Sequence, residues 1–206
     1  MNKLLVSGVY DAHTLKTLMD LGTKAVAFDL RGRSPNLIPF SQLKTILTKS
    51  QNFEASLLFE NDRPSTIFSF LNLLKEVSTP LVLQFRDQQN AAYYQQFDLP
   101  FTWMFHPDAA WREILPLNKL KGLLLPIKFQ SFYQNSAEFW DLINYYQIEV
   151  YLHAESIEES ELTLGAEGIN LSFDLTGELE NGFRSIDQDR LKKLKVWSFV
   201  HEDLAS

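Results

Sequence analysis

The chain has 206 residues, of which 45% are hydrophobic and 22% charged, a composition that excludes disordered, collagen-like and low-complexity proteins. Its formal charge of −7, with no compensating basic stripe, argues against nucleic-acid binding, and no apolar run approaches the roughly 18 residues of a membrane span. The absence of cysteine excludes disulfides, thiolate metal sites and cysteine nucleophiles. The apolar stretch near the N-terminus is shorter than a signal-peptide core, so we expect a cytoplasmic protein.

Short apolar runs recur along the chain, and a longer segment follows each of them. The runs are Leu4–Ser7, Ala25–Leu30, Ala55–Phe59, Leu81–Phe85, Phe101–Phe105, Gly122–Ile127, Glu149–His153 and Ile169–Phe173. Most are nearly continuous in apolar residues, as parallel strands buried on both faces are. Eight such units predict an α/β protein, a closed (β/α)8 TIM barrel, rather than an open doubly wound sheet. With no linker or change of composition, residues 1–206 are expected to form one domain.

The segments between the runs carry helix signals. Helical spacing, capping residues or an N-terminal proline predict helices over Asp11–Asp20, after Pro64, over Ser136–Tyr146 and after the capping box Ser185–Gln188. The fifth unit has room for only a short helix between Pro107 and Pro116.

Functional side chains of such barrels lie at the C-terminal ends of the strands. Polar residues stand at or just beyond the ends of the apolar runs: Ser7, Asp29, Glu60, Arg86, His106, Lys128, His153, Glu155 and Asp174. Solvent exposure alone places polar residues at strand ends. Their convergence on a single barrel mouth is what makes them a candidate site.

Several segments follow one another in the order and at the spacing of known family motifs. They are Leu5–Gly8, Gly22–Phe28 with Ser34–Asn36, Leu83–Arg86, Leu123–Pro126, Leu152–Glu155, and Ile169–Asp174 with Gly182–Arg184. Leu5–Gly8 corresponds to Lys-Ile-Cys-Gly, Gly22–Phe28 to Gly-Ala-Asp-Ala-(Ile/Leu)-Gly-Phe, and Ser34–Asn36 to Ser-Pro-Arg. Leu83–Arg86 corresponds to Val-Gln-Leu-His, Leu123–Pro126 to Leu-Leu-Asp, and Leu152–Glu155 to Leu-Ala-Gly-Gly. Ile169–Asp174 corresponds to Val-Asp-Val-Ser-Ser-Gly and Gly182–Arg184 to Gly-Val-Lys. The chain therefore resembles, almost end to end, the phosphoribosylanthranilate isomerases, small (β/α)8 barrels of tryptophan biosynthesis.

The resemblance implies an Amadori rearrangement, in which an aminoaldose opens and becomes an aminoketose by acid–base proton transfers. The family uses a cysteine of the first strand as general base and an aspartate of the sixth as general acid. Those positions hold Ser7 and Pro126 here. A serine hydroxyl needs an activating neighbour to act as a base, and proline has no titratable proton. We therefore expect that the parent activity has been lost.

The positions that bind the substrate's anionic groups in the family also differ. Glu155 and Asp174 replace glycines whose backbone N–H groups approach the phosphate. A carboxylate within a few ångströms of the phosphate costs about 4 kcal/mol or more at an effective dielectric constant of about 20. Asn36 replaces the arginine that meets the anthranilate carboxylate, and Arg31 and Arg33 in the same loop are candidate substitutes.

The charges of the mouth allow two arrangements. Either Asp174 and Glu155 neutralise Arg86 and Lys128 within the protein, or they face a cationic or hydroxyl-rich ligand. We favour internal neutralisation, because buried charges are rarely left unpaired. The resulting hypothesis is a salt-bridged mouth at an inactive site that takes up neither phosphate nor sulfate.

Three interpretations of function remain open. The first is a diverged barrel without isomerase activity, which binds another small molecule or acts through protein contacts. The second is a working isomerase, an intramolecular oxidoreductase, with catalytic groups relocated to Arg86, Lys128 or His153. The third is a barrel enzyme with another small-molecule reaction around Arg86, His106, Lys128 and Asp174.

These interpretations share one set of candidate residues. The candidate catalytic residues are Ser7, Arg86 and Lys128, with Pro126 at the family's acid position. The candidate substrate-binding residues are Arg31, Asn36, His106, His153, Glu155 and Asp174. No metal-ligand spacing and no nucleotide-binding motif is present, so we expect neither metal nor cofactor. The expected partner is a small-molecule ligand or none, with no nucleic acid and no membrane, and the expected state is a monomer or homodimer.

Overall fold

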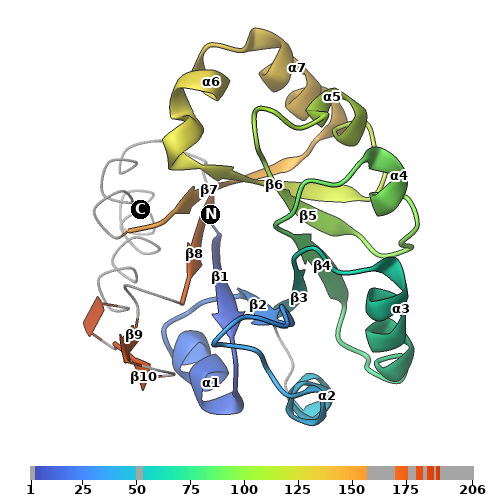
Figure 1. Ribbon diagram of the computed structural model, residues 1–206. Coiled ribbons are helices and arrows are strands. Elements are labelled where there is room, and N and C mark those ends of the chain that lie inside the picture. Colours follow the sequence, from blue (N-terminus) through green and yellow to red (C-terminus); the bar gives the residue numbers. More distant parts are fainter. Residues whose placement is uncertain are drawn as a thin grey trace, which may run out of the picture.

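A computed structural model describes residues 3–49, 53–156, 170–175, 180–182, 185–187 and 189–190. Eight parallel strands close into a barrel in sequential order, with β1 paired to β8 (Figure 1). They are β1 (Leu4–Val9), β2 (Ala25–Asp29), β3 (Glu54–Phe59), β4 (Leu81–Phe85), β5 (Phe101–Met104), β6 (Leu120–Pro126), β7 (Glu149–Ala154) and β8 (Asn170–Asp174). The predicted (β/α)8 barrel is confirmed.

The bounds of β4 are those of the predicted run, and those of the other strands differ from the prediction by one or two residues. The largest difference is at β6, which begins at Leu120 and ends at Pro126, because Ile127 already belongs to the short helix η1 (Ile127–Phe129). Ile169, where the eighth run was predicted to begin, lies outside the described residues.

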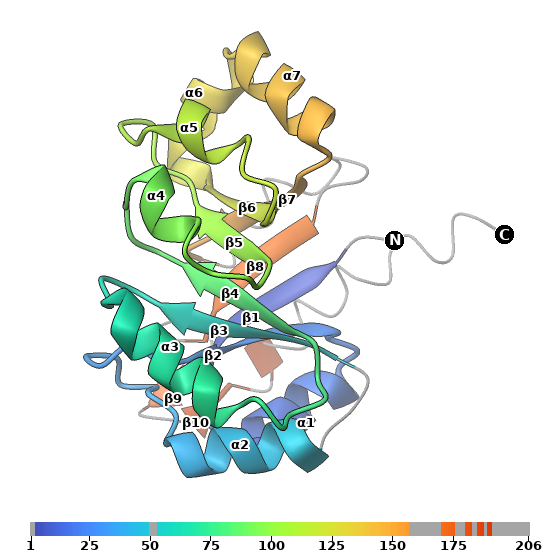
Figure 2. The same ribbon diagram turned by 90° about the vertical axis from the view of Figure 1, so that its right-hand side faces the viewer.

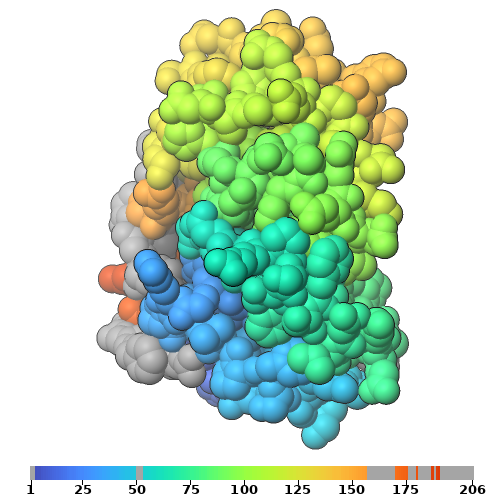
Figure 3. All heavy atoms as spheres, turned by 45° about the vertical axis from the view of Figure 1, so that its right-hand side comes forward, coloured from blue at the N-terminus to red at the C-terminus, as the bar shows by residue number. Residues whose placement is uncertain are grey.

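The described helices lie on the outside of the barrel (Figures 1 and 2). They are α1 (Ala12–Asp20), α2 (Phe40–Lys49), α3 (Pro64–Leu73), α4 (Ala91–Tyr94), α5 (Trp111–Ile114), α6 (Gln130–Gln134) and α7 (Ala137–Tyr146). In the space-filling view, successive helical units form adjacent bands over the visible side, from blue through green to yellow (Figure 3). Within the described part of the chain, no helix is long and apolar enough to cross a membrane.

Local capping chemistry explains where several helices begin. The Asp11 carboxylate accepts a hydrogen bond from the Thr14 backbone N–H (2.7 Å), and Pro64 occupies the first turn of α3. Ser136 accepts from the backbone N–H of Phe139 at the start of α7. The short fifth helix is confirmed, and α4 is equally short.

The predicted capping box at Ser185 is wrong. Ser185 belongs to β10 (Ser185–Ile186), which pairs antiparallel with β9 (Glu180–Gly182). The Asp187 carboxylate instead accepts from the backbone N–H groups of Asp189 and Arg190. Gln188, the rest of the predicted helix and residues 183–184 of the matched motif lie outside the described residues.

Alternate residues of each strand face opposite sides of the barrel wall. Outward-facing residues such as Val6, Phe28 and Trp103 join the main hydrophobic core, which also contains Leu15 and Leu18 of α1. A smaller apolar cluster lies inside the barrel and consists of Leu5, Ala25, Leu124 and Tyr151, with Met104 against it. The other face of the strands also supplies buried polar residues to the interior: Ser7, Ser56, Gln84, Thr102, His153 and Ser172.

A bulge in β1 ends this alternation at the mouth. The pairing of β1 with β2 shifts between Ser7 and Val9, and the intervening Gly8 has a φ of 92°. Val9 is fully buried in the outer core. Ser7 is therefore the last residue of β1 that faces the barrel interior.

Candidate functional site at the C-terminal mouth of the barrel

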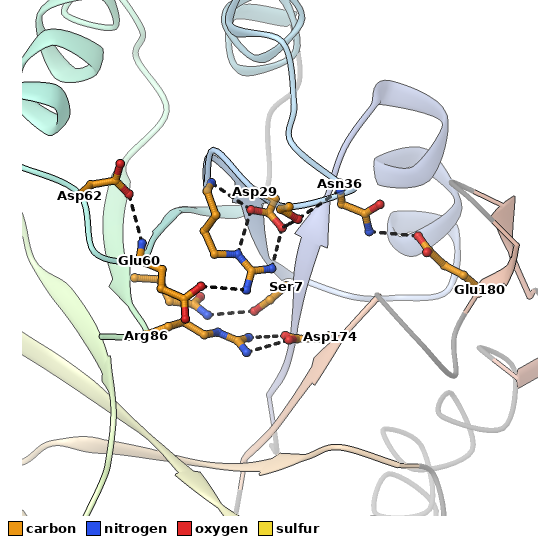
Figure 4. A network of polar contacts seen from close by, with 11 residues as sticks. Ser7, Asp29, Asn36, Glu60, Asp62, Arg86, Asp174 and Glu180 are labelled. Carbon is orange, nitrogen blue, oxygen red and sulfur yellow. Dashed lines mark hydrogen bonds and ion pairs between the residues drawn. The ribbon is translucent and has the colours of Figure 1, made fainter. Parts of the chain in front are cut away.

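An ion pair crosses the mouth between two opposite strands (Figure 4). Arg86 directly follows β4 and Asp174 ends β8, and these strands are four positions apart in the closed ring of eight. Nη1 of Arg86 donates to Oδ2 of Asp174 (2.7 Å), and Nη2 donates to Oδ1. The two side chains are 9% and 22% exposed, so the pair is largely withdrawn from water. Both terminal nitrogens of Arg86 are therefore occupied by the chain itself.

Asp174 is held in its charged form by its surroundings. Burial by itself would raise the pKa of the Asp174 carboxyl, but the charge and hydrogen bonds of Arg86, with help from Arg31, bring that pKa below its usual value. The pair is therefore a true ion pair at neutral pH.

His153, near the end of β7, adds a neutral imidazole to the interior side of the mouth. Its side chain is buried, and Nδ1 lies 3.3 Å from Oγ of Ser172. Burial, followed by the positive charge of Arg86, lowers the pKa of His153 to about 4. His153 lies beside Pro126 in the pairing of β7 with β6.

Ser7 is fully buried and hydrogen-bonded across the barrel. Its Oγ accepts from Nε2 of Gln84 on β4 (2.9 Å). A side-chain amide that donates to the hydroxyl supplies no base to activate it. Three polar atoms on this part of the wall have no partner among the described residues: Oε1 of Gln84, Nε of Arg86 and Oγ1 of Thr102.

Arg31 builds the loop after β2. The buried Asp29 carboxylate accepts from the backbone N–H, Nε (3.0 Å) and Nη2 (2.7 Å) of Arg31, and from the hydroxyl of Ser34 (2.6 Å). Nη1 of Arg31 lies 3.7 Å from Oε2 of Glu60. These contacts occupy Arg31 as a structural element of the loop.

Asn36, in the same loop, faces a carboxylate. Its side chain is buried, and its Nδ2 donates to Oε1 of Glu180 on β9 (3.0 Å), while its Oδ1 has no partner among the described residues. Figure 4 shows Glu180 beside Asn36, on the side away from Arg86.

Lys128 and Glu155 form a second ion pair (2.6 Å), in which both side chains are more than half exposed. Of the two arrangements that the sequence allowed, the structure therefore shows internal pairing, both here and at Arg86 and Asp174. His106 is 40% exposed, with its ring against Phe129, over which the Lys128 ammonium also lies, and its Nδ1 is 3.7 Å from Asp108.

Of the candidate residues, the structure thus brings Ser7, Arg86, His153 and Asp174 together. Arg31 and Asn36 lie in the adjacent loop after β2. Lys128 and Glu155 form a separate ion pair. Sequence analysis missed Gln84, Ser172 and Glu180. Gln84 was detectable, because it lies two residues before Arg86 and so shares its face of the strand. Within the described residues no group of three histidine or acidic side chains has a metal-binding arrangement.

Comparison with known proteins supports the fold. No protein-family model and no curated protein matches the chain. Phosphoribosyl anthranilate isomerase from Thermus thermophilus is 17% identical with a TM-score of 0.69, covering 94% of this chain and 96% of that one. Monomers generated from the dimeric Thermotoga maritima isomerase are 14% identical (TM-score 0.68, 95% and 97% covered). TrpF from Jonesia denitrificans is 12% identical (TM-score 0.65, 95% of each chain covered). The resemblance to phosphoribosylanthranilate isomerases is thereby confirmed in the fold.

Proposed function

We propose that this chain is a phosphoribosylanthranilate-isomerase-like barrel that does not catalyse the Amadori rearrangement and that binds a small molecule without a phosphate group. The observation that chiefly supports this proposal is the Arg86–Asp174 pair. Asp174 stands where the resemblance implies a phosphate-binding glycine, and its carboxylate is ionised. A fixed negative charge at that position opposes a phosphate dianion.

The positions of the catalytic acid and base give the proposal independent support. The hydroxyl of Ser7 accepts a hydrogen bond from the side-chain amide of Gln84, and Pro126, buried at the end of β6, has no titratable proton. Proton transfer to and from the substrate therefore lacks both groups that the resemblance implies.

The test is an assay of phosphoribosylanthranilate isomerisation by loss of substrate fluorescence. We expect no turnover by the natural chain. Ser7→Cys combined with Pro126→Asp is expected to restore little, because Asp174 and Glu155 still oppose the phosphate. The Thermus thermophilus enzyme in the same assay is the positive control. Substantial turnover by the natural chain would overturn the proposal, as would a sulfate ion bound at the ends of β7 and β8 in soaked crystals.

A working isomerase with relocated groups is the second candidate, and the neutral imidazole of His153 beside Pro126 favours it. A neutral histidine can accept a proton from a substrate. Turnover that is abolished in His153→Asn but retained in His106→Asn would select this candidate over the first.

A cytoplasmic location and a monomeric or homodimeric state belong to the same proposal. The solved Thermotoga maritima isomerase is described as dimeric, which supports measuring the mass of this chain in solution by light scattering.

A further inference from the structure

We infer that Asp174 is the residue that excludes oxyanions from this barrel. Its carboxylate forms an ion pair with the guanidinium of Arg86, which would otherwise be able to bind an oxyanion. This inference rests on the proposed function and identifies one residue that determines which ligands are excluded from the mouth of the barrel. The chemical class concerned is a carboxylate, sulfate or phosphate group that accepts two parallel hydrogen bonds.

The geometry of Arg86 is that of oxyanion recognition. Two N–H groups of one guanidinium meet the two oxygens of one carboxylate, the two-point arrangement that arginine also makes with carboxylate and phosphate ligands. Nε of Arg86 is buried and has no partner among the described residues. The carboxylate of Asp174 therefore satisfies only part of what this guanidinium can donate.

Arg31 provides the contrast within the same mouth. Its partner Asp29 is two residues away and also holds Ser34, so that pair folds a loop. Arg86 and Asp174 are 88 positions apart. The barrel closes at this place through the backbone pairing of β1 with β8. The Arg86–Asp174 contact therefore has no comparable local role in building the fold.

The surrounding charges favour an anion once the carboxylate of Asp174 is removed. Arg31 acts on Asp174 with a favourable charge, and the field of Arg86 helps to keep His153 neutral. The other carboxylates of the mouth are already paired, Asp29 and Glu60 with Arg31 and Glu155 with Lys128. An external oxyanion would replace the internal one at Arg86 with the same two hydrogen bonds.

The experiment measures binding of inorganic phosphate, sulfate and acetate by calorimetry, in the full chain. We expect no detectable binding to the natural protein, and an affinity of Asp174→Gly at least about tenfold above the detection limit, which corresponds to about 1.4 kcal/mol. Adding Arg86→Gln to that variant should abolish the gain. Glu76→Gly is the matched control, because it removes the carboxylate of an exposed ion pair with Lys44 of α2 that involves no candidate site residue, and it should gain nothing.

Thermal unfolding of each variant establishes that it is folded, and Asp174→Asn, which keeps a neutral acceptor for Arg86, is the second variant. A gain for all three anions supports recognition of oxyanions in general, and a gain for phosphate and sulfate alone narrows the class to tetrahedral anions. Folded Asp174 variants that bind no anion would overturn the inference and leave the proposed function standing. Binding of acetate alone by the natural protein would overturn the inference but not the proposed function, and binding of phosphate or sulfate at its mouth would overturn both.

Discussion

His153 illustrates how a single position in the barrel wall acquires unusual chemistry. The outward-facing residues of β7 pack in the core, while His153 faces the interior beside Ser172, with Arg86 close enough to act on its charge. Burial and Arg86 together oppose protonation. The residue is therefore an uncharged polar member of the mouth at neutral pH.

This state makes the stability of the protein depend on pH. The histidine takes up a proton at pH about 6.5 in the unfolded chain but only at about 4 in the native protein. The unfolded state therefore binds more protons between these values, and the free energy of unfolding should fall by up to about 3 kcal/mol as the pH drops through this window. Urea denaturation across that range measures the slope.

His153→Asn should show a shallower slope over the same window, because asparagine does not titrate. His106→Asn is the control, since His106 is 40% exposed and stands apart from the group at Arg86. An equally steep slope in His153→Asn would contradict the assignment of this window to His153.

The polar residues of the mouth and their internal pairing were predictable, but which acid meets which base was not. Residue type and strand period placed Arg86, His153 and Asp174 at strand ends, because parallel strands end at one edge. The pairing of Arg86 with Asp174 depends on which strands face each other across the closed ring, a property of the whole sheet. Glu180 gave no signal at all, since its contact with Asn36 depends on the path of the chain after β8.

Among the elements, β1 shows a local irregularity with a clear purpose. The bulge at Gly8 rotates Val9 out of the mouth and into the outer core. The φ of 92° at Gly8 is one that residues with a side chain rarely adopt, while a Cβ there would meet only ordinary contacts of 3.6 Å or more. The requirement for glycine is therefore one of backbone conformation rather than space.

Gly8→Ala is expected to lower the free energy of unfolding by about 1–2 kcal/mol through this strain. Gly32→Ala is the matched control, because a Cβ at Gly32 meets nothing within 4 Å and its φ lies outside the positive range. Chemical denaturation of both variants provides the comparison. A loss of the same size in the two variants would refute the strain argument.

The helix starts show why some element boundaries follow from sequence and others do not. Asp11, Pro64 and Ser136 act on residues within one turn, so their signals are local and the prediction succeeds. The motif at Ser185 has the same local features, but Ser185 pairs with Gly182 and therefore belongs to a strand. The Asp187 carboxylate instead accepts the hydrogen bond from the backbone N–H of Arg190. Strand pairing overrides the local preference there.

At the scale of the molecule, the two ends of the barrel hold different polar groups. At the N-terminal end, Glu149 accepts from Lys3 (2.6 Å) and from the Tyr151 hydroxyl (2.9 Å), and Lys121 pairs with Glu54. The C-terminal end holds the Arg86–Asp174 pair and the loops around it. In barrels of this architecture the first end serves stability and the second serves ligands.

Glu149→Gln should therefore lower the free energy of unfolding by about 1 kcal/mol, a size set by its partial exposure, 31%. The same change should leave anion binding by Asp174→Gly unaltered. Glu76→Gln, which breaks a pair with Lys44 whose glutamate is 85% exposed, should change neither quantity. Coupling between Glu149 and anion binding would show that the two ends do not act independently.

The pair across the mouth also constrains how such a protein can evolve. Replacing Asp174 alone leaves the guanidinium of Arg86, which is 9% exposed, without its counter-charge. Replacing Arg86 alone leaves the carboxylate of Asp174 without its counter-charge. Either single step lowers stability before any new ligand can compensate, because an unpaired charge withdrawn from water is strongly unfavourable. The two positions are therefore coupled, and a substitution at one of them is tolerated best when the other changes with it.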